Sequence, residues 1–564
     1  MSEDFTPPPR VAIKQRALEE NLPADSELRN YLVGKEETTR HASARPGTDL
    51  RRFRAAYRDF PRTLLIMPPM CMYEGAVKRV IPPLGLCYIA AQLEREGIES
   101  DILDCIVEGV DTEERVADGV WRFGMSEDGF RSWIAARNHD VYAFSMIYSS
   151  DIENLYRYAE IVKEMKPTAI VIAGGLHASI YTERFLRDGV RQGRRVIDFV
   201  IRGEGELRLG QFLRHLAVGR IDRNADGLAG WLDDQLFVNP QFQQIENHDV
   251  LPYPAYHKVP IEKYFDHNVP FSPYPQGNRV MQILTSRGCP IGCTFCASTN
   301  FAKAYRVRSV DSVIAEVAFY KERYHIDEIQ FADDNLTLNK GRSIDLFTKL
   351  RSAGLPWCTP NGIMVNTLDD EVLDAMIRSG LYQITLSIDS GSADTLKNRH
   401  RKPVRLDRVP ALMKYLVDRE VLVHGTLVIG MPGETEEEIR EGFRYVEGLP
   451  FNSINVFIAQ ALPGSELFEK SISNGAITYE KALRIDTAKS TLRLASIDGE
   501  LLEQMLSAFL ERYNEAIYAR DPAAWMRKYA NHRERLASLC VGKASPITST
   551  IIQASAQAGI PASR

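Results

Sequence analysis

The chain has 564 residues, with 69 Lys and Arg against 75 Asp and Glu, so its formal net charge is −6. Hydrophobic residues make up 44% of it and charged residues 26%, which are ordinary globular values and argue against disorder, collagen and coiled-coil rods. The mildly acidic total gives no reason to expect a general nucleic-acid binder, and no run approaches the roughly 18 apolar residues of a membrane span.

Residues 1–60 are Pro-rich and then charged, and we interpret them as a lead-in without a strand pattern. They begin MSEDFTPPPR, which lacks a basic region followed by an apolar stretch and so does not read as a signal peptide. Eight Cys in 564 residues are too few for a disulfide scaffold. We therefore expect a cytoplasmic protein.

Residues 61–240 alternate apolar runs with amphipathic stretches. Continuous apolar strands between helices are typical of a parallel sheet covered on both faces. The pattern predicts a doubly wound, Rossmann-like α/β domain of the flavodoxin type, with a ligand crevice at the carboxyl ends of its strands. Strands are expected at 63–67, 100–103, 141–146, 169–173 and 199–201, helices near 84–96, 127–137, 151–165, 179–191 and 205–218, and a small hairpin around 227–234.

Residues 241–278 form a connector rich in Pro, Tyr and Phe, and the fixed φ of Pro suits a strap packed between domains better than a flexible tether. A second alternating series fills residues 279–475. Its repeats are too few for a closed eight-fold barrel and predict a partial (βα)6 barrel. Strands are expected at 280–285, 327–332, 359–365, 382–388, 422–429 and 453–458, and helices at about 309–324, 341–353, 369–379, 391–397, 405–418 and 434–447.

Residues 476–545 are predicted to form a small helical domain, with two helices between 499 and 540. An apolar stripe at helical spacing supports the first helix. The stripe consists of Leu502, Met505, Phe509, Tyr513 and Ile517. The last segment, 546–564, is rich in Ser, Ala and Thr and is expected to be a loose tail.

Three of the eight cysteines, Cys289, Cys293 and Cys296, lie in one short segment directly after a predicted strand. Three thiolates in one loop can bind three irons of a [4Fe–4S] cube and leave the fourth iron without a protein ligand. A small molecule with an amine and a carboxylate can chelate that iron. Structural zinc is the alternative, but it needs four ligands, usually as paired C-x2-C motifs, and the next Cys along the chain is Cys358.

The triplet, with Phe295 before its last Cys, resembles the signature of the radical S-adenosylmethionine (SAM) superfamily. Segments 331–336, 387–391 and 428–435, at later strand ends, resemble its SAM-binding motifs, although singly each could be an Asx turn or a helix start. The family more often has Glu where Asp389 stands. The resemblance implies SAM contacts from Phe295, Asp333, Asp334, Asn335, Ser387, Asp389 and Gly430.

The first domain has neither G-x-G-x-x-G nor a Walker A sequence, which removes most support for NAD or a nucleoside triphosphate. Its strand ends resemble the cobalamin-binding domain that precedes the barrel in one large class of radical SAM enzymes. The contacts that this resemblance implies are Leu84, Gly85, Asp104, Ser145, Gly174, Gly175, His177, Gly203, Glu204 and Glu206. The D-x-H-x-x-G motif that gives cobalt a histidine is absent, so His177 is the one substitute, with polar contacts to the loop or corrin edge as its alternative role.

The whole arrangement is similar to the cobalamin-dependent radical SAM methyltransferase family. A closer resemblance, to its members in phosphonate and phosphinate antibiotic pathways, extends over most of residues 61–475. The segments that carry it are 262–265, 285–289, 308–310, 354–357, 382–383 and 423–425. The resemblance implies a [4Fe–4S] cluster, SAM, methylcobalamin and an external one-electron reductant of the flavodoxin or ferredoxin type. SAM would be cleaved to a 5′-deoxyadenosyl radical, and cobalamin would methylate an unactivated carbon, or a phosphinate phosphorus, of a small natural-product intermediate. No nucleic-acid or membrane partner is expected, and no catalytic acid or base is assigned.

Candidate substrate contacts are Arg306, Arg308, Asn361, Asn366 and His424. Arginine suits a phosphoryl group because its planar fork matches the oxygens, but both arginines fit a solvated barrel edge equally well.

Three alternatives stay open. Cobalamin-dependent radical SAM cyclases and oxidases share this layout without methyl transfer. A methylthiotransferase would use Cys71, Cys87 and Cys105 for a second cluster. A non-enzymatic cobalamin sensor would not need the cysteine triplet.

Overall fold

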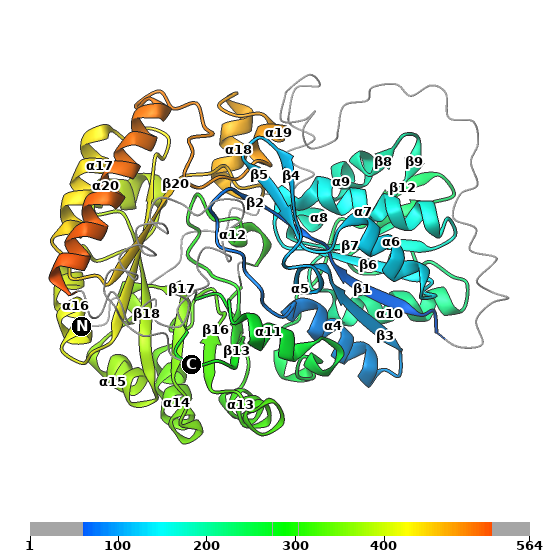
Figure 1. The fold of residues 1–564 in the computed structure, drawn as a ribbon, viewed down its shortest axis with the longest axis horizontal. Coiled ribbons are helices and arrows are strands. Elements are labelled where there is room, and N and C mark those ends of the chain that lie inside the picture. The colour runs from blue at the N-terminus through cyan, green and yellow to red at the C-terminus, as the bar shows by residue number, and fades with distance from the viewer. Residues whose placement is uncertain (1–59, 273–274, 303, 522–564) are drawn as a thin grey trace.

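The computed structural model describes residues 60–272, 275–302 and 304–521, and it places two sheets side by side along the long axis of the molecule (Figure 1). The predicted lead-in up to residue 59, the second C-terminal helix beyond residue 521 and the tail 546–564 lie outside the described residues. None of the described helices combines the length and the apolar character that a membrane crossing requires.

The first sheet has the strand order β12-β11-β10-β7-β6-β1-β3. Its parallel part has the predicted flavodoxin-type order, with the second strand at the edge beside the first. These strands are β1 Thr63–Met67, β3 Ser100–Asp104, β6 Val141–Met146, β7 Ile170–Gly175 and β10 Phe199–Ile201. The predicted hairpin, β11 Leu228–Leu232 and β12 Gln235–Val238, extends the sheet in antiparallel fashion.

Helices cover both faces of this sheet, as continuous apolar strands require. One apolar core lies under α6, α7 and α9, and a second lies under α4 and α10. The helices are α4 Leu84–Arg95, α5 Cys105–Glu108, α6 Glu127–Ala135, α7 Ile152–Met165, α8 Leu176–Ile180, α9 Thr182–Asp188 and α10 Gly205–Ala217. The single helix expected at 179–191 is wrong: α8 and α9 divide it at Tyr181, and its last residues begin the ribbon of β8 Val190–Arg191 and β9 Arg194–Arg195.

A small antiparallel sheet of β2 Met70–Tyr73, β5 Val120–Phe123 and β4 Glu113–Ala117 was not predicted. Four of the five residues of β4 are exposed, so the strand has no apolar face that a sequence pattern could show.

The second sheet runs in chain order, β13-β16-β17-β18-β19-β20, with every pair parallel. This agrees with the predicted partial barrel. Its strands are β13 Val280–Ile283, β16 Glu328–Phe331, β17 Trp357–Ile363, β18 Leu381–Asp389, β19 Leu422–Ile429 and β20 Ser453–Ile458. Its helices are α13 Val310–Tyr324, α14 Lys340–Leu350, α15 Asp370–Arg378, α16 Val409–Val417 and α17 Glu436–Glu447. The short helix expected at 391–397 is instead a π-helix, η6 Thr395–His400.

The connector touches both halves. Ala255 donates a backbone hydrogen bond to Cys87 of α4, and the ring of the next residue, Tyr256, packs edge-on against Tyr320 of α13. Helix α11 Ile261–His267 follows. The connector therefore packs as a strap between the sheets.

Three helices complete the described chain, α18 Glu466–Ser473, α19 Tyr479–Ala482 and α20 Gly499–Arg520. The predicted apolar stripe of α20 is buried, and Phe509 stacks on Phe443 of α17 with ring centroids 4.0 Å apart. Helix α20 lies at the outer edge of the second sheet, beside α17 (Figure 1).

Candidate functional site

The three clustered cysteines lie in a loop that closes on a two-stranded stem. The stem pairs β14 Ser286–Arg287 with β15 Arg306–Val307, directly after β13. Gly288 has a φ of +86°, and a Cβ at this position would lie 2.3 Å from the carbonyl oxygen of Ala304, so the entry to the loop requires glycine. The Cys289 amide then donates to Ala302 across the loop.

The loop thiols are half-buried and form no disulfide, whereas Cys87, Cys105 and Cys358 are fully buried. Burial raises the pKa of Cys289 and raises that of Cys293 to about 12, where Asp389 and the two other thiols add to the effect and Lys402 opposes it. Thiolates at this position therefore need added positive charge, which iron supplies. Among the described residues no three His, Cys, Asp or Glu side chains are arranged around a single metal ion; the ligands of a cube bind separate irons.

Buried polar atoms without partners lie beside this loop. His400 is fully buried, and neither of its ring nitrogens has a hydrogen-bond partner among the described residues. Its ring meets Phe295 edge-on at 5.3 Å, and its carbonyl accepts from the amide of Thr294. Because a buried polar group without a partner is costly, these atoms fit a site that a polar group completes. His400 is not among the residues that the sequence predicts for the site.

The residues after β16 hold the cysteine loop. Asp333 accepts hydrogen bonds from the Thr285 amide and hydroxyl, at 3.1 and 2.7 Å, and from the Ser286 hydroxyl. Asp334 accepts from the Gly288 amide at 3.3 Å. Both carboxylates thus fix the loop stem, which differs from the SAM contact expected of Asp333. Asn335 is buried, and its side-chain oxygen has no partner among the described residues.

The remaining predicted SAM residues lie at the carboxyl ends of β18 and β19. Asp389 adopts a left-handed φ of +61° and pairs with Lys402 at 2.5 Å, while Thr426 donates to it at 3.3 Å. Ser387, two residues earlier in β18, is half-buried.

Gly430, with a φ of +77°, donates its amide to a buried carboxylate, Glu434, at 2.6 Å. Burial raises the pKa of Glu434 to about 7, and its second oxygen has no partner among the described residues.

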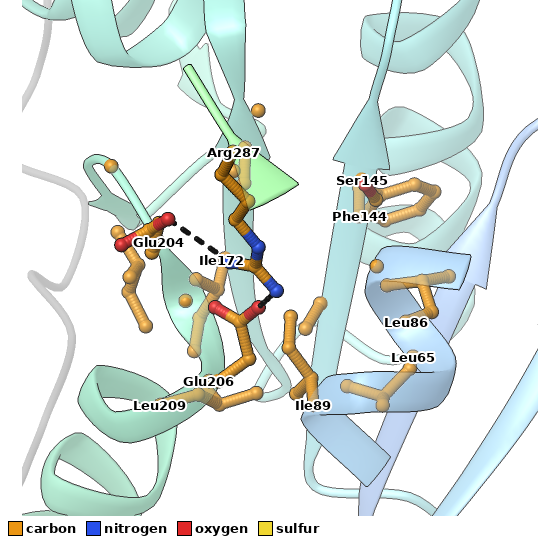
Figure 2. Close-up of a pocket in the computed structure, with 18 residues that line it drawn as sticks. Leu65, Leu86, Ile89, Phe144, Ser145, Ile172, Glu204, Glu206, Leu209 and Arg287 are labelled. Carbon is orange, nitrogen blue, oxygen red and sulfur yellow. Dashed lines mark hydrogen bonds and ion pairs between the residues drawn. The ribbon is translucent and has the colours of Figure 1, made fainter. Parts of the chain in front are cut away.

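A cavity of about 200 Å³ opens at the carboxyl ends of β1, β6, β7 and β10 (Figure 2). Its walls are the apolar side chains of Leu65, Leu86, Ile89, Phe144 and Ile172. Of the residues predicted to contact cobalamin, those that line it are Gly85, Ser145, Gly174, Gly175, Gly203, Glu204 and Glu206. Small residues form one wall by necessity: a Cβ on Gly175 would lie 2.0 Å from the Met146 carbonyl oxygen.

Three other predicted cobalamin residues lie outside this cavity. Leu84 packs against the small core of Tyr88, Ile245 and Leu251. Asp104 caps α5 through the Ile106 amide and accepts from the hydroxyl of Tyr264 in the strap at 2.6 Å.

His177 has both ring nitrogens occupied, by the Ser149 hydroxyl and by the Tyr479 hydroxyl of α19, each at 2.9 Å. Burial lowers its pKa to about 3. In this arrangement neither nitrogen is available to cobalt, so the alternative role, polar contacts within the fold, is the one that the geometry favours.

Each candidate substrate residue has an ion-pair or hydrogen-bond partner within the protein. Arg308 pairs with the buried Glu316 of α13, and Arg306 pairs with Glu204 at 2.8 Å. The Asn361 amide donates to the carbonyl oxygens of Ala332 and Asp333, at 3.0 and 3.1 Å, beside the predicted SAM segment.

Asn366 accepts from the Arg405 amide at 3.0 Å. His424 is the third residue of β19, at the end of the strand opposite Gly430, and contacts the Ser453 hydroxyl at 2.6 Å. Both arginines are ion-paired in the interior, so the solvated edge that the sequence left open is wrong. Their phosphoryl contact stays a prediction.

The cysteines of the first domain lie in separate places. Cys87 belongs to the core that the strap shares with the barrel, and Cys105 belongs to the core under α6 and α7. Cys71 is half-buried on β2. Because Cys87 and Cys105 are buried in different cores, their positions argue against the second cluster of a methylthiotransferase.

Comparison with known proteins identifies both halves of the chain. Residues 283–446 match the family model of the radical SAM superfamily, and residues 73–213 match that of the B12 binding domain. The chain is 33% identical over 490 residues to a cytidylyl-2-hydroxyethylphosphonate methyltransferase from Streptomyces wedmorensis, covering 81% of this chain and 90% of the relative. It is 30% identical to an uncharacterized methyltransferase of Pyrococcus horikoshii, covering 80% and 92%.

Among solved structures, the radical SAM methyltransferase TsrM from Kitasatospora setae superimposes with a TM-score of 0.57 at 17% identity, over 72% of this chain and 75% of TsrM. At this identity the likeness shows the shared fold alone.

Proposed function

The chain belongs to the cobalamin-dependent (B12-binding) radical SAM methyltransferases, and on that premise we propose that it methylates an unactivated carbon of a small phosphonate. A phosphinate phosphorus is the other acceptor consistent with the sequence resemblance. The single observation that carries the choice of substrate class is the 33% identity, across both domains, to a methyltransferase whose name specifies a cytidylylated hydroxyethylphosphonate.

The family uses a [4Fe–4S] cluster, SAM and cobalamin. When bound, these groups supply the reductive cleavage of SAM to a carbon radical and a transferable methyl group. We assign the three iron contacts to Cys289, Cys293 and Cys296, whose loop is held by Asp334 through Gly288. A reductant is required by the family, and we propose a flavodoxin or ferredoxin type.

The cavity of the first sheet is proposed to receive cobalamin. Its volume of about 200 Å³ is below the roughly 300–1,000 Å³ of pockets that enclose a whole drug-sized ligand, so we propose that it receives only part of the cofactor. Apolar walls and glycines match a flat, weakly polar group such as the nucleotide base of the cofactor, and the macrocycle would lie outside, at the strand ends.

The open ends of β18 and β19 are proposed to hold SAM. Ser387, the Asp389–Lys402 pair and Gly430 lie there. The His400 nitrogens, which have no partner in the part of the chain that the structure describes, lie beside the cysteine loop. The aromatic ring of Phe295 packs against the apolar core around Met431 and Leu467. On this proposal, that core keeps water away from a radical formed beside it.

The test is anaerobic reconstitution of the full chain with iron, sulfide and cobalamin, followed by reductant, methyl-deuterated SAM and a panel of phosphonates that includes a cytidylylated hydroxyethylphosphonate. We expect a deuteromethylated product together with S-adenosylhomocysteine and 5′-deoxyadenosine. A cyclase or oxidase would form 5′-deoxyadenosine with a modified but unlabelled product. A complete absence of 5′-deoxyadenosine would contradict radical chemistry of any kind.

A further inference from the structure

The stem of the cysteine loop carries two arginines side by side. Arg287 of β14 and Arg306 of β15 are register partners, so they bracket the segment 288–305 that contains all three clustered cysteines. Arg287 is two residues before Cys289 and also lines the cavity of the first sheet (Figure 2). One side chain therefore belongs to both proposed cofactor regions.

Two glutamates of the first domain receive these arginines. Glu204 immediately precedes α10, and Glu206 lies in its first turn. Arg287 spans both, with its two terminal nitrogens 3.0 Å from Glu204 and 2.7 Å from Glu206. Arg306 reaches the other oxygen of Glu204 at 2.8 Å, and the Ile245 amide donates to the same oxygen at 2.6 Å.

Because these four side chains are largely buried, the attraction between their charges is screened less by water than in a surface ion pair. The side chains of Glu204, Glu206 and Arg306 are 8%, 6% and 8% exposed, and that of Arg287 is 17% exposed. Burial alone would raise the pKa of Glu204, but hydrogen bonds from His248 and Arg306 and the charge of Arg287 lower it below its usual value. Removing one partner leaves a buried charge uncompensated, which is strongly destabilising locally.

We propose that Arg287, Arg306, Glu204 and Glu206 form an interdomain clamp through which filling of the first-sheet cavity orders the cysteine loop. Arg287 is a positioning residue in this clamp. A group that fills the cavity shields the guanidinium from water and holds it between the two glutamates, and β14 passes that restraint to Cys289. The inference takes from the proposed function only that the cavity receives cobalamin.

Coupling of this kind is reciprocal. If bound cobalamin raises the affinity of the loop for the cluster by some factor, then an assembled cluster must raise the affinity for cobalamin by the same factor. A role of Arg287 in stability alone would lower both affinities without linking them. The linkage is therefore the readout that separates a clamp from ordinary packing.

The test measures hydrogen exchange of peptides within residues 288–305 in the cluster-free full chain, with and without hydroxocobalamin. In the wild type we expect cobalamin to slow this exchange about fivefold or more, the lower range of allosteric coupling. In Arg287→Met, cobalamin should still bind, more weakly, without slowing the exchange. Arg287→Lys keeps the charge but not the two-pronged contact, and should retain part of the effect.

The matched control is Arg214→Met, which removes an ion pair to Glu96 at the other end of α10 and should behave as the wild type. The clamp would be overturned if bound cobalamin left the hydrogen exchange of the wild-type loop unchanged. It would also be overturned if cobalamin still slowed that exchange in Arg287→Met. A wild-type chain that does not bind hydroxocobalamin would overturn the proposed function instead. If Arg287→Met does not fold, the partial effect of Arg287→Lys decides the question.

Discussion

The two proposed cofactor regions are built in opposite ways. Around the cysteine loop and the end of β19, carboxyl side chains fix the backbone: Asp333, Asp334 and Glu434 each accept hydrogen bonds from main-chain amides. The cavity of the first sheet is defined by side chains that are missing, through glycines such as Gly174 and Gly175. The first region thus depends on hydrogen-bonding groups and the second on an unfilled cavity. Removing a polar group should therefore damage the first, and adding a side chain should damage the second.

The largest effect is expected at the cysteine loop itself. Cys293→Ala removes one of three proposed iron contacts, so the chain should lose the reconstituted cluster and all turnover while still binding hydroxocobalamin. Iron and sulfide content, with an absorption titration of cobalamin, measure the two regions separately. Cys358→Ala, a buried thiol in β17, is the control and should keep the cluster. Full cluster content in Cys293→Ala would contradict the assignment.

The next effect separates the cavity from the loop. A Cβ on Gly85, the second residue of α4, meets nothing within 4 Å, so Gly85→Leu should fill the cavity without a clash in the fold. We expect cobalamin affinity to fall roughly 10- to 100-fold, because the added side chain occupies the space of the ligand. This corresponds to a loss of about 1–3 kcal/mol in binding free energy, and the cluster should be unchanged. Gly85→Ala should change affinity much less. Unaltered binding in the leucine variant would place cobalamin elsewhere.

A third effect, of similar size, distinguishes two roles of Asp333. If it holds the loop stem, Asp333→Asn replaces one of its two acceptor oxygens by an NH2 group, so either the Thr285 amide or the Thr285 and Ser286 hydroxyls lose their acceptor. This should lower the free energy of unfolding by about 1–3 kcal/mol. Asp345→Asn, at an exposed pair with Lys349, is the control and should change it by less than about 0.5 kcal/mol. Weakened SAM binding at unchanged stability would instead support the contact that the sequence motif implied.

The last effect is a pH dependence, expected where α18 meets the first domain. The hydroxyl of Tyr181 donates to Glu469 at 2.9 Å, and burial raises the pKa of Glu469 to about 7. Because the folded pKa exceeds the unfolded value, the glutamate favours folding fully at pH values below about 4.5 and loses this contribution as pH rises through 7.

Glu469→Gln should therefore gain stability relative to the wild type between pH 4.5 and 7.5, by about 1–3 kcal/mol. Chemical denaturation across this range measures the difference. Parallel stability curves for the two proteins would contradict the raised pKa.

The local sequence pattern was enough to predict the parallel strands, because strands buried on both faces of a sheet appear as short continuous apolar runs between helices. The exposed strand β4, with its charged residues, gave no such signal. In the site, cysteines and strand-end glycines were identifiable by type and position. Their partners were not, because the pairs that fix the geometry join residues far apart in sequence, such as Arg287 with Glu204 and His177 with Tyr479. No local pattern encodes such a pair, so the sequence alone does not predict that Arg306 pairs with Glu204.

The central claim is that the loop of Cys289, Cys293 and Cys296 anchors a cluster with one iron left for SAM. Electron paramagnetic resonance of the reduced, reconstituted full chain, recorded with and without SAM, tests it most directly. We predict a [4Fe–4S] signal whose g values shift when SAM is added. A cluster signal that SAM leaves unchanged, or a tetrathiolate zinc centre in anaerobically purified protein, would contradict the account.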